Sequence, residues 1–434
     1  MPVPRRIVIA GVGLMSPLGF GGWATFRALL DGRSIADRAP GIEPGTDPVA
    51  LVQGLGHVAV VRQAPDDPAA ELAERAAREA CEQAGVDIRG LPTRLGTSKG
   101  AVHALAKSFA PGRKPRLASG GASGATSGGI SGGTSGGAAH AAALGPHGFL
   151  SHRLTVRTGC RVTGHHVAAC ASSLVALDAA AWELRFQNDE DGELTSALSP
   201  HPSDLALIVA AESALLPAFV HSYKRLGVLA DPTPEGYRQA PLDQSRRGFM
   251  LAELAAAVVL RALPPGEEPA PGEIELIGTA VAGEAYDTVR ASPTMDALGH
   301  VASGLLRDAG GRLDLLHPHA PGTPDHDPTE LGVLADVVNA SREMTHEHPP
   351  VDAYAVKGAL GHGLGSAGLV SLVIACLCGR ARRRPPMPWL TRPMTPAPLP
   401  LRRDARPLPD DAAQAVFAAG FGGPTAGALI RRQP

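Results

Sequence analysis

The sequence predicts an α/β fold that arose by internal duplication. Short apolar runs rich in Val and Ile alternate with segments of helical periodicity along the chain. The alternation occurs twice in a similar layout, and a Pro-rich acidic connector, LPPGEEPAPGE, separates the two stretches. Alternating strands and helices are typical of α/β folds. We therefore expect an N-terminal half over residues 1–262 and a C-terminal half over residues 263–434.

The N-terminal half opens with RRIVIAGV at 5–12, a continuous apolar run typical of a strand buried on both faces. Helices are expected over 22–31 and 68–84, and the second one ends at Gly85. Residues 118–139 are rich in Gly and Ser, so we expect a flexible coil there. HHVAACASSLVALDAAAWEL then predicts a strand, a turn and a helix, and DLALIVAAES predicts another buried strand.

The C-terminal half repeats this layout without repeating the sequence. IELIGTAVAGEAYD opens it like the first strand, and helices are expected over 295–308 and 328–341. AYAVKGALGHGLGSAGLVSLVIACL again predicts a strand, a turn and a helix. AQAVFAAGFGGPTAGALIRR predicts a terminal hairpin with a tight Gly turn.

One segment has the length of a membrane span. Residues 359–379 carry no formal charge, but five Gly and one His interrupt them, and the apolar run proper covers only 369–378. A run of about ten apolar residues favours a buried core helix, so we expect no membrane span. The N-terminus lacks the apolar region and cleavage site of a signal peptide, and the five Cys are not a disulfide framework. Both features favour a cytoplasmic location.

The charge balance argues against nucleic acid as a partner. The 434 residues hold 40 Lys+Arg against 42 Asp+Glu, a formal net charge of −2, and aromatic residues are 4% of the chain. The chain therefore lacks both the basic excess and the stacking side chains that nucleic-acid binding uses.

Three motifs carry weak signals. Gly11 and Gly13 resemble part of a dinucleotide fingerprint, but Ser16 replaces its third glycine, which favours a tight turn at the strand exit. GTSKG at 96–100 matches the nucleophile elbow of esterases, which makes Ser98 an alternative nucleophile. HPHAPGTPDHD could bind a metal, but its prolines and its lack of a helical His pair disfavour that. We expect neither a metal nor a cofactor.

Cys170 is the strongest single candidate for chemistry. In VAACASSLVAL a small apolar strand leads into the Cys, and a helix follows. The helix N-terminus favours a thiolate, so we expect a lowered pKa, and the Cys170 N–H could bind an oxyanion. The alternative is a small buried core residue.

Further motifs follow in a fixed order and decide between these alternatives. HAPGTP begins at His319, KGALGHGLGSAG begins at Lys357 and contains His362, and GFGG contains Phe421. APLDQSRRGFMLAELAAAVVL precedes them. Together with ACASS, this ordered set resembles the β-ketoacyl-[acyl-carrier-protein] synthases of the thiolase superfamily. The resemblance runs from about residue 5 to 431 and has its main gap in the Gly/Ser tract.

The resemblance implies a five-layered αβαβα thiolase-like fold built from two pseudo-repeats. It also implies the elongating Cys-His-His branch, in which Cys170 accepts an acyl group and a malonyl thioester then loses CO2 and attacks it. His319 and His362 would donate hydrogen bonds to the enolate oxygen. The N–H groups of Cys170 and Phe421 would form the oxyanion hole, and the Phe421 side chain would gate the acyl pocket.

The resemblance further implies supporting residues. Lys357 would stabilise the histidines and pair with Glu330. Thr323, in the HAPGTP motif of His319, would be a further supporting residue. The sequence departs from the family pattern at Pro321 in that motif, at Leu254 in the GEG segment, and at Thr425 after GFGG. These departures bear on recognition of the carrier arm, chain length and rate rather than on Cys-His-His.

The implied partner is an acyl carrier protein, loaded with the acyl or the malonyl group. Lys224 and Arg225 resemble the family's docking position, and Lys107, Arg113, Lys114 and Arg116 are a second candidate. The resemblance implies a homodimer, or a heterodimer with a second ketosynthase-like chain. The alternative functions are a chain-length-factor-like partner subunit, which typically lacks the Cys, and an esterase built on Ser98. Fatty acid and polyketide synthesis both fit the motifs.

Overall fold

The computed structural model describes most of the chain. The described residues are 4–35, 68–108, 134–186, 204–230, 232–233, 236–237, 239–345, 350–394 and 399–434. Within them, one mixed 11-stranded sheet runs through the molecule, and two two-stranded ladders lie outside it.

The sheet consists of two halves with the same topology. The N-terminal half has the order β4-β3-β5-β8-β1, and the C-terminal half has the order β11-β10-β14-β15-β9. When the five strands of each half are counted along the chain, both orders read 3-2-4-5-1. In this spatial order, the first three strands of each half pair in parallel. The fourth strand pairs antiparallel with the third and with the fifth. This identity confirms the predicted internal duplication.

The strands of the two halves have the following bounds. The N-terminal half contains β1 (Ile7–Ser16), β3 (Pro92–Gly96), β4 (Arg161–His166), β5 (Leu205–Glu212) and β8 (Leu254–Ala262). The C-terminal half contains β9 (Ile274–Gly283), β10 (Leu315–His317), β11 (Asp352–Ala353), β14 (Ala413–Ala419) and β15 (Pro424–Arg432). The halves join where Val8 of β1 pairs with Glu275 of β9.

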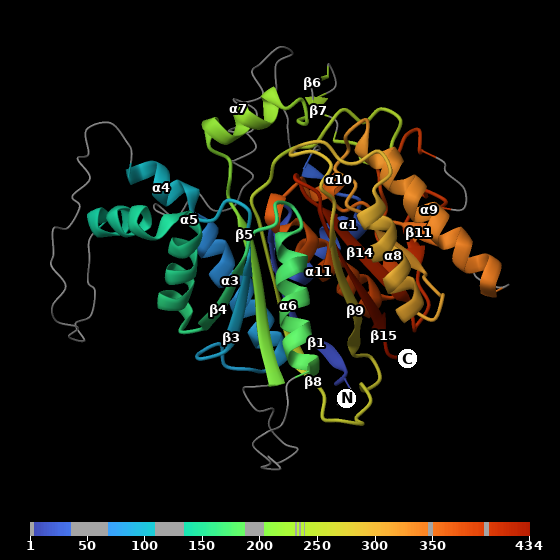
Figure 1. Ribbon diagram of the computed structural model, residues 1–434, viewed down its shortest axis with the longest axis horizontal. Coiled ribbons are helices and arrows are strands. Elements are labelled where there is room, and N and C mark those ends of the chain that lie inside the picture. Colours follow the sequence, from blue (N-terminus) through green and yellow to red (C-terminus); the bar gives the residue numbers. More distant parts are fainter. Residues whose placement is uncertain are drawn as a thin grey trace.

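Helices complete five layers (Figure 1). The helices α6 (Ser172–Phe186) and α11 (Ala367–Ala381) contact each other and strands of both halves, so they form the middle layer. On the outside of the N-terminal half lie α3 (Pro68–Ala84) and α5 (Thr134–Thr158). On the outside of the C-terminal half, α8 (Asp296–Asp308) packs on β9 and β15, and α9 (His326–Thr345) packs on α8. The predicted αβαβα layering is therefore present.

The remaining elements are short. They are α1 (Gly22–Leu30), α4 (Val102–Ser108), α7 (Pro217–Arg225), α10 (Lys357–Leu360), the 3-10 helix η3 (Leu364–Ser366), β2 (Gly19–Phe20), β6 (Pro232–Thr233), β7 (Gly236–Tyr237), β12 (Arg383–Arg384) and β13 (Arg406–Pro407). The predicted helices over 22–31, 68–84 and 295–308 agree with α1, α3 and α8 to within one residue. The helix predicted over 328–341 is longer at both ends, as α9.

Two predictions about flexible or turning segments are corrected. Gly11 and Gly13 lie inside β1 rather than at its exit. A Cβ on Gly11 would lie 2.0 Å from the Ala80 carbonyl oxygen, and one on Gly13 would lie 2.0 Å from that of Ala76. The two glycines therefore let α3 pack directly on the strand. Of the Gly/Ser tract, residues 118–133 lie outside the described residues, and 134–139 begin α5 instead of forming a coil.

The membrane-like segment lies in the middle layer, as predicted. By length and composition, Leu364–Ala381 is the one helix in the described part of the chain that could cross a membrane, and 89% of it is buried inside the protein. Every residue of α11 from Ala367 to Gly379 is buried. A helix covered by sheet on both sides must be apolar all round, which explains the resemblance to a span.

Candidate active site

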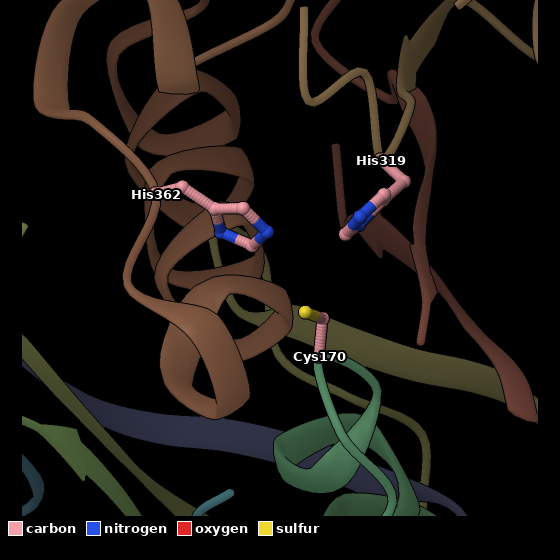
Figure 2. Close-up of side chains that lie close together, drawn as sticks. All are labelled: Cys170, His319 and His362. Carbon is pink, nitrogen blue, oxygen red and sulfur yellow. The ribbon is translucent and has the colours of Figure 1, made fainter. Parts of the chain in front are cut away.

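Three side chains meet between the two halves of the fold. Cys170, His319 and His362 each bring one sulfur or ring nitrogen to a group in which all three atoms lie within 4.8 Å of one another. Figure 2 shows that the Cys170 sulfur lies between the two imidazoles. Cys170 directly precedes the turn into α6, His319 follows β10, and His362 precedes η3. All three side chains are buried.

The backbone around Cys170 supplies two amide groups. A Cβ on Gly420 would lie 3.0 Å from the Cys170 nitrogen, so only a glycine lets the 420–421 turn pass this close. Neither the Cys170 nor the Phe421 N–H donates a hydrogen bond to an acceptor of the described residues. Amides without an acceptor near a nucleophile are what an oxyanion hole requires.

The pKa of the Cys170 thiol is raised, whereas the sequence predicted that it would be lowered. Burial raises the pKa of Cys170 to about 12, and the nearby Lys357 only partly opposes this. The predicted lowering by the helix N-terminus is therefore wrong for the resting protein, because desolvation of the thiolate dominates. At neutral pH the resting group is a thiol, and its proton must leave as it attacks.

His362 is held in a single tautomer. Its backbone is fixed by two bonds to the segment before β8: the His362 N–H donates to Met250 O at 2.8 Å, and the Ala252 N–H donates to His362 O at 3.1 Å. The Leu364 N–H donates to Nδ1 of the ring at 3.2 Å. Burial holds the pKa of His362 well below its usual value, so the ring is neutral. Because Nδ1 accepts, the single ring proton is on Nε2, which can donate.

His319 is bracketed by two buried charged groups. The Glu330 carboxylate accepts the His319 N–H at 2.6 Å and the Ala320 N–H at 2.7 Å. On the other side the Lys357 ammonium donates to the His319 carbonyl oxygen. Burial, together with the positive charge of Lys357, holds the pKa of His319 well below its usual value. His319 is therefore also a neutral imidazole.

Lys357 supports His319, but not through the contact that the resemblance implies. Among the described residues, Lys357 and Glu330 do not form an ion pair: no Glu330 oxygen lies within 4.0 Å of Lys357 Nζ. Lys357 and Glu330 instead bind opposite polar groups of the same His319 backbone. Burial lowers the pKa of Lys357 to about 8, and Glu330 opposes this shift. Lys357 is 3% exposed, which excludes a solvent-exposed lysine at a strand end.

Left-handed backbone occurs within two residues of each of the three site residues. Ala169 before Cys170 has φ of 47°, Ala320 after His319 has 34°, and Leu364 after His362 has 46°. Non-glycine residues rarely adopt such angles, at a cost of roughly 1–3 kcal/mol each. Strained backbone therefore accompanies the convergence of these three side chains.

Aromatic side chains line one side of the site. Phe421 stacks on Tyr223 of α7 with ring centroids 6.4 Å apart, and Tyr223 meets Phe249 at 6.1 Å. Phe249 in turn contacts His362 edge-on at 4.7 Å. These residues share a buried cluster with Cys170. The GFGG motif identified Phe421 in advance, but the sequence did not identify Tyr223, because the resemblance of its helix concerned only Lys224 and Arg225.

The other candidates lie away from the three residues or in the scaffold. Ser98 is buried, and its hydroxyl makes no hydrogen bond to a histidine in the described part of the chain, so an esterase lacks its base. His317 points into the core, where Nε2 contacts Gln414 at 3.1 Å, so it does not join His319 and His326 in the metal site that the sequence already disfavoured. Thr323 is half-buried and accepts a bond from Arg246 through its carbonyl oxygen at 3.0 Å.

The departures from the family pattern are all buried. Pro321 follows the strained Ala320, and Thr425 lies in β15 opposite Ala282. Leu254 begins β8, and its Cβ would lie 2.9 Å from a Cβ on Gly363, directly after His362. Cys170, His319 and His362 converge in a chain that carries all three departures.

The docking candidates are only partly described. Lys224 and Arg225 are exposed at the end of α7, the helix that carries Tyr223 on its buried side. Arg113, Lys114 and Arg116 lie outside the described residues, as does the side chain of Lys107. His326, considered above only as a metal ligand, lies beside His319 with ring centroids 5.2 Å apart.

Comparison with known proteins gives the same assignment. The model of the "Beta-ketoacyl synthase, N-terminal domain" matches residues 4–265, and that of the "Beta-ketoacyl synthase, C-terminal domain" matches residues 274–390. The 3-oxoacyl-[acyl-carrier-protein] synthase 2 of Coxiella burnetii is 26% identical over 90% of this chain and 89% of its own length. The tetracenomycin polyketide synthase ketoacyl synthase alpha subunit of Streptomyces glaucescens is 24% identical over 86% and 84%.

Solved structures share the fold. A type II polyketide ketosynthase, solved with its acyl-carrier protein as AntDE:AntF, matches with a TM-score of 0.72 and 19% identity over 99% of both chains. The ketosynthase from module 6 of the bacillaene synthase of Bacillus subtilis 168 matches with a TM-score of 0.69 and 18% identity, over 99% of this chain and 72% of its own. With both family models matched and Cys-His-His intact, the chain belongs to the β-ketoacyl synthase family, the condensing acyltransferases of fatty acid or polyketide synthesis.

Proposed function

We propose that this protein is a 3-oxoacyl-[acyl-carrier-protein] synthase that elongates an acyl group by decarboxylative condensation with a malonyl thioester. The observation that carries the proposal is the convergence of a buried thiol with two neutral imidazoles, all within 4.8 Å. Each group suits one part of the reaction, which proceeds in two stages through an acyl-enzyme.

In the first stage the Cys170 sulfur attacks the acyl thioester. The thiol proton passes to the departing carrier thiolate, so the stage needs no net proton. The N–H groups of Cys170 and Phe421 stabilise the tetrahedral oxyanion, and Phe421 and Tyr223 border the path of the acyl chain.

In the second stage the malonyl thioester loses CO2, and negative charge develops on its thioester oxygen. His362 donates to that oxygen from Nε2, the nitrogen that the Leu364 contact leaves protonated. His319 donates the second hydrogen bond. One such donor contributes roughly 3 kcal/mol to stabilisation of the transition state. The enolate carbon then attacks the acyl-enzyme, and the product leaves as a 3-oxoacyl thioester.

The partner in this proposal is a separate acyl carrier protein. The exposed Lys224 and Arg225 support docking on α7, since the same helix reaches the site through Tyr223. A homodimer of this chain is supported by the edge strand β4 and by the exposed apolar side chains Val167 and Trp182 beside it. We also propose a cytoplasmic location, because its five free cysteines suit a reducing compartment and the carrier protein would be present there.

The test is acylation of the protein by an acyl carrier thioester, followed by intact mass. The wild-type chain should gain the acyl mass, and Cys170→Ala should not. Cys160→Ala, which removes a buried cysteine of the same half, should behave as wild type. No acylation of wild type would contradict the proposal and favour a partner subunit, and acylation of Cys170→Ala at Ser98 would favour the esterase.

A further inference from the structure

The proposed reaction consumes one proton per cycle. CO2 leaves the malonyl group, and the electron pair left behind forms the new C–C bond to the acyl carbon. The C–S bond to Cys170 then breaks, and its electron pair remains on sulfur as a thiolate. The resting group is a thiol, so one proton must enter from water in each cycle. Cys170 is 8% exposed, His319 4% and His362 1%, so the proton needs a route.

His326 stands between His319 and the surface. It is the first residue of α9, and its side chain is 14% exposed, more than those of the three site residues. Its ring lies 5.2 Å from that of His319 at an interplanar angle of 66°. The His319 ring lies 5.3 Å from that of His362. The three imidazoles thus form a chain from the edge of the site to its centre.

Two nitrogens along this chain are buried without a hydrogen bond. They are His319 Nδ1 and His326 Nε2, for which no described residue provides a hydrogen-bond partner. His326 Nε2 lies 3.5 Å from Glu330 Oε2, close enough for attraction when the ring is protonated. A buried unpaired nitrogen is costly, and a proton shared between two rings would relieve that cost.

We propose that His326 is the entry point for the proton that each condensation consumes. His326 takes a proton from water and passes one to His319, and His319 delivers one to the Cys170 thiolate. Glu330 stabilises the transient imidazolium at His326. Two acidic groups of α9, Glu330 and Asp327, lie near His326. The inference rests on the proposed function, because only the condensation step has this proton demand.

The experiment separates the two stages in His326→Ala. First acylation of Cys170 should keep its wild-type rate, because the thiol proton leaves with the carrier thiolate. Steady-state condensation should fall by about 100-fold, the lower end of the usual contribution of a positioned proton-transfer group. Imidazole added to the buffer should restore condensation, because the alanine leaves space for it. His326→Phe fills that space and should show no rescue. His300→Ala removes an exposed histidine of α8 and should leave both stages unchanged.

Two results would overturn the inference. One is condensation by His326→Ala at the wild-type rate. The other is an equal loss of both stages without imidazole rescue, which would assign His326 a structural role through Glu330. If wild-type protein acylates but never condenses, the proposed function fails first and the proton route falls with it.

Discussion

The two halves of the molecule have one topology and two different chemistries. In each half, two backbone N–H groups of the loop after the second strand, β3 or β10, donate hydrogen bonds to a buried glutamate. In the N-terminal half Glu212 accepts the N–H groups of Ser98 and Lys99, and in the C-terminal half Glu330 accepts those of His319 and Ala320. The same device positions an inert loop in one half and a reactive histidine in the other.

The difference shows how the duplicated fold divides the work. Each half places one residue before a helix of the middle layer: Cys170 before α6, and His362 before α11. In the proposed reaction the N-terminal half thus supplies the nucleophile, and the C-terminal half supplies the two donors for the enolate. The acyl group and the enolate must meet, so both residues lie where α6 and α11 pack together.

The largest expected effect comes from breaking this division at His362. His362→Ala removes an enolate donor and should lower malonyl decarboxylation by roughly 100- to 1,000-fold, while acylation of Cys170 continues. Cys170→Ala should show the reverse pattern, with decarboxylation retained and acylation lost. Release of CO2 and intact mass measure the two activities. Loss of both activities in either variant would contradict the separation of roles.

An intermediate effect, on stability and on the pH profile, should distinguish Glu330 from Glu212. Glu330→Gln replaces the charged acceptor of the His319 and Ala320 N–H groups and removes a negative charge that favours the Lys357 ammonium, so it should lower the free energy of unfolding by about 2 kcal/mol. Glu330 normally raises the pKa of Lys357, which burial holds at about 8. Without it that pKa falls further, so condensation should decline at a lower pH on the alkaline side, because Lys357 loses its proton earlier.

Glu212→Gln is the matched control for this effect. Burial already raises the pKa of Glu212, and Glu212 is not among the groups that shift Lys357. The alkaline limit of condensation should therefore stay where it is in wild type. Urea unfolding and the pH profile of condensation measure the two properties. An equal alkaline shift in both variants would show that the limit does not report on Lys357.

The smallest expected effect is a gain in stability at Ala320. Its φ of 34° suits glycine, so Ala320→Gly should raise the free energy of unfolding by about 1 kcal/mol. Ala340→Gly, at an exposed position of α9, should lower it by about the same amount. Thermal unfolding measures both changes. A loss of stability at both positions would mean that the left-handed backbone at Ala320 carries no strain.

Much of the fold could be predicted from the sequence because its strands are continuous apolar runs and its helices have periodic faces. The core helix α11 and the layout of both halves followed from these patterns. The roles of Gly11 and Gly13 did not, because the helix that packs on them lies about 65 residues further on, and a local motif cannot show this.

The site shows the same limit. Cys170, His319, His362 and Lys357 stand in motifs and could be named in advance. The bracketing of His319 by Lys357 and Glu330, the tautomer of His362 and the position of His326 depend on contacts between distant segments. The raised pKa of Cys170 depends on burial from every side, which the helix N-terminus alone does not reveal.

The deep burial of Cys170 also determines how the protein withstands oxidants and alkylating reagents. These reagents attack the thiolate, and a group with a pKa of about 12 is almost wholly protonated at neutral pH. Burial should therefore slow the reaction of Cys170 with peroxide between turnovers, while in the proposed reaction a bound thioester still reaches the thiol.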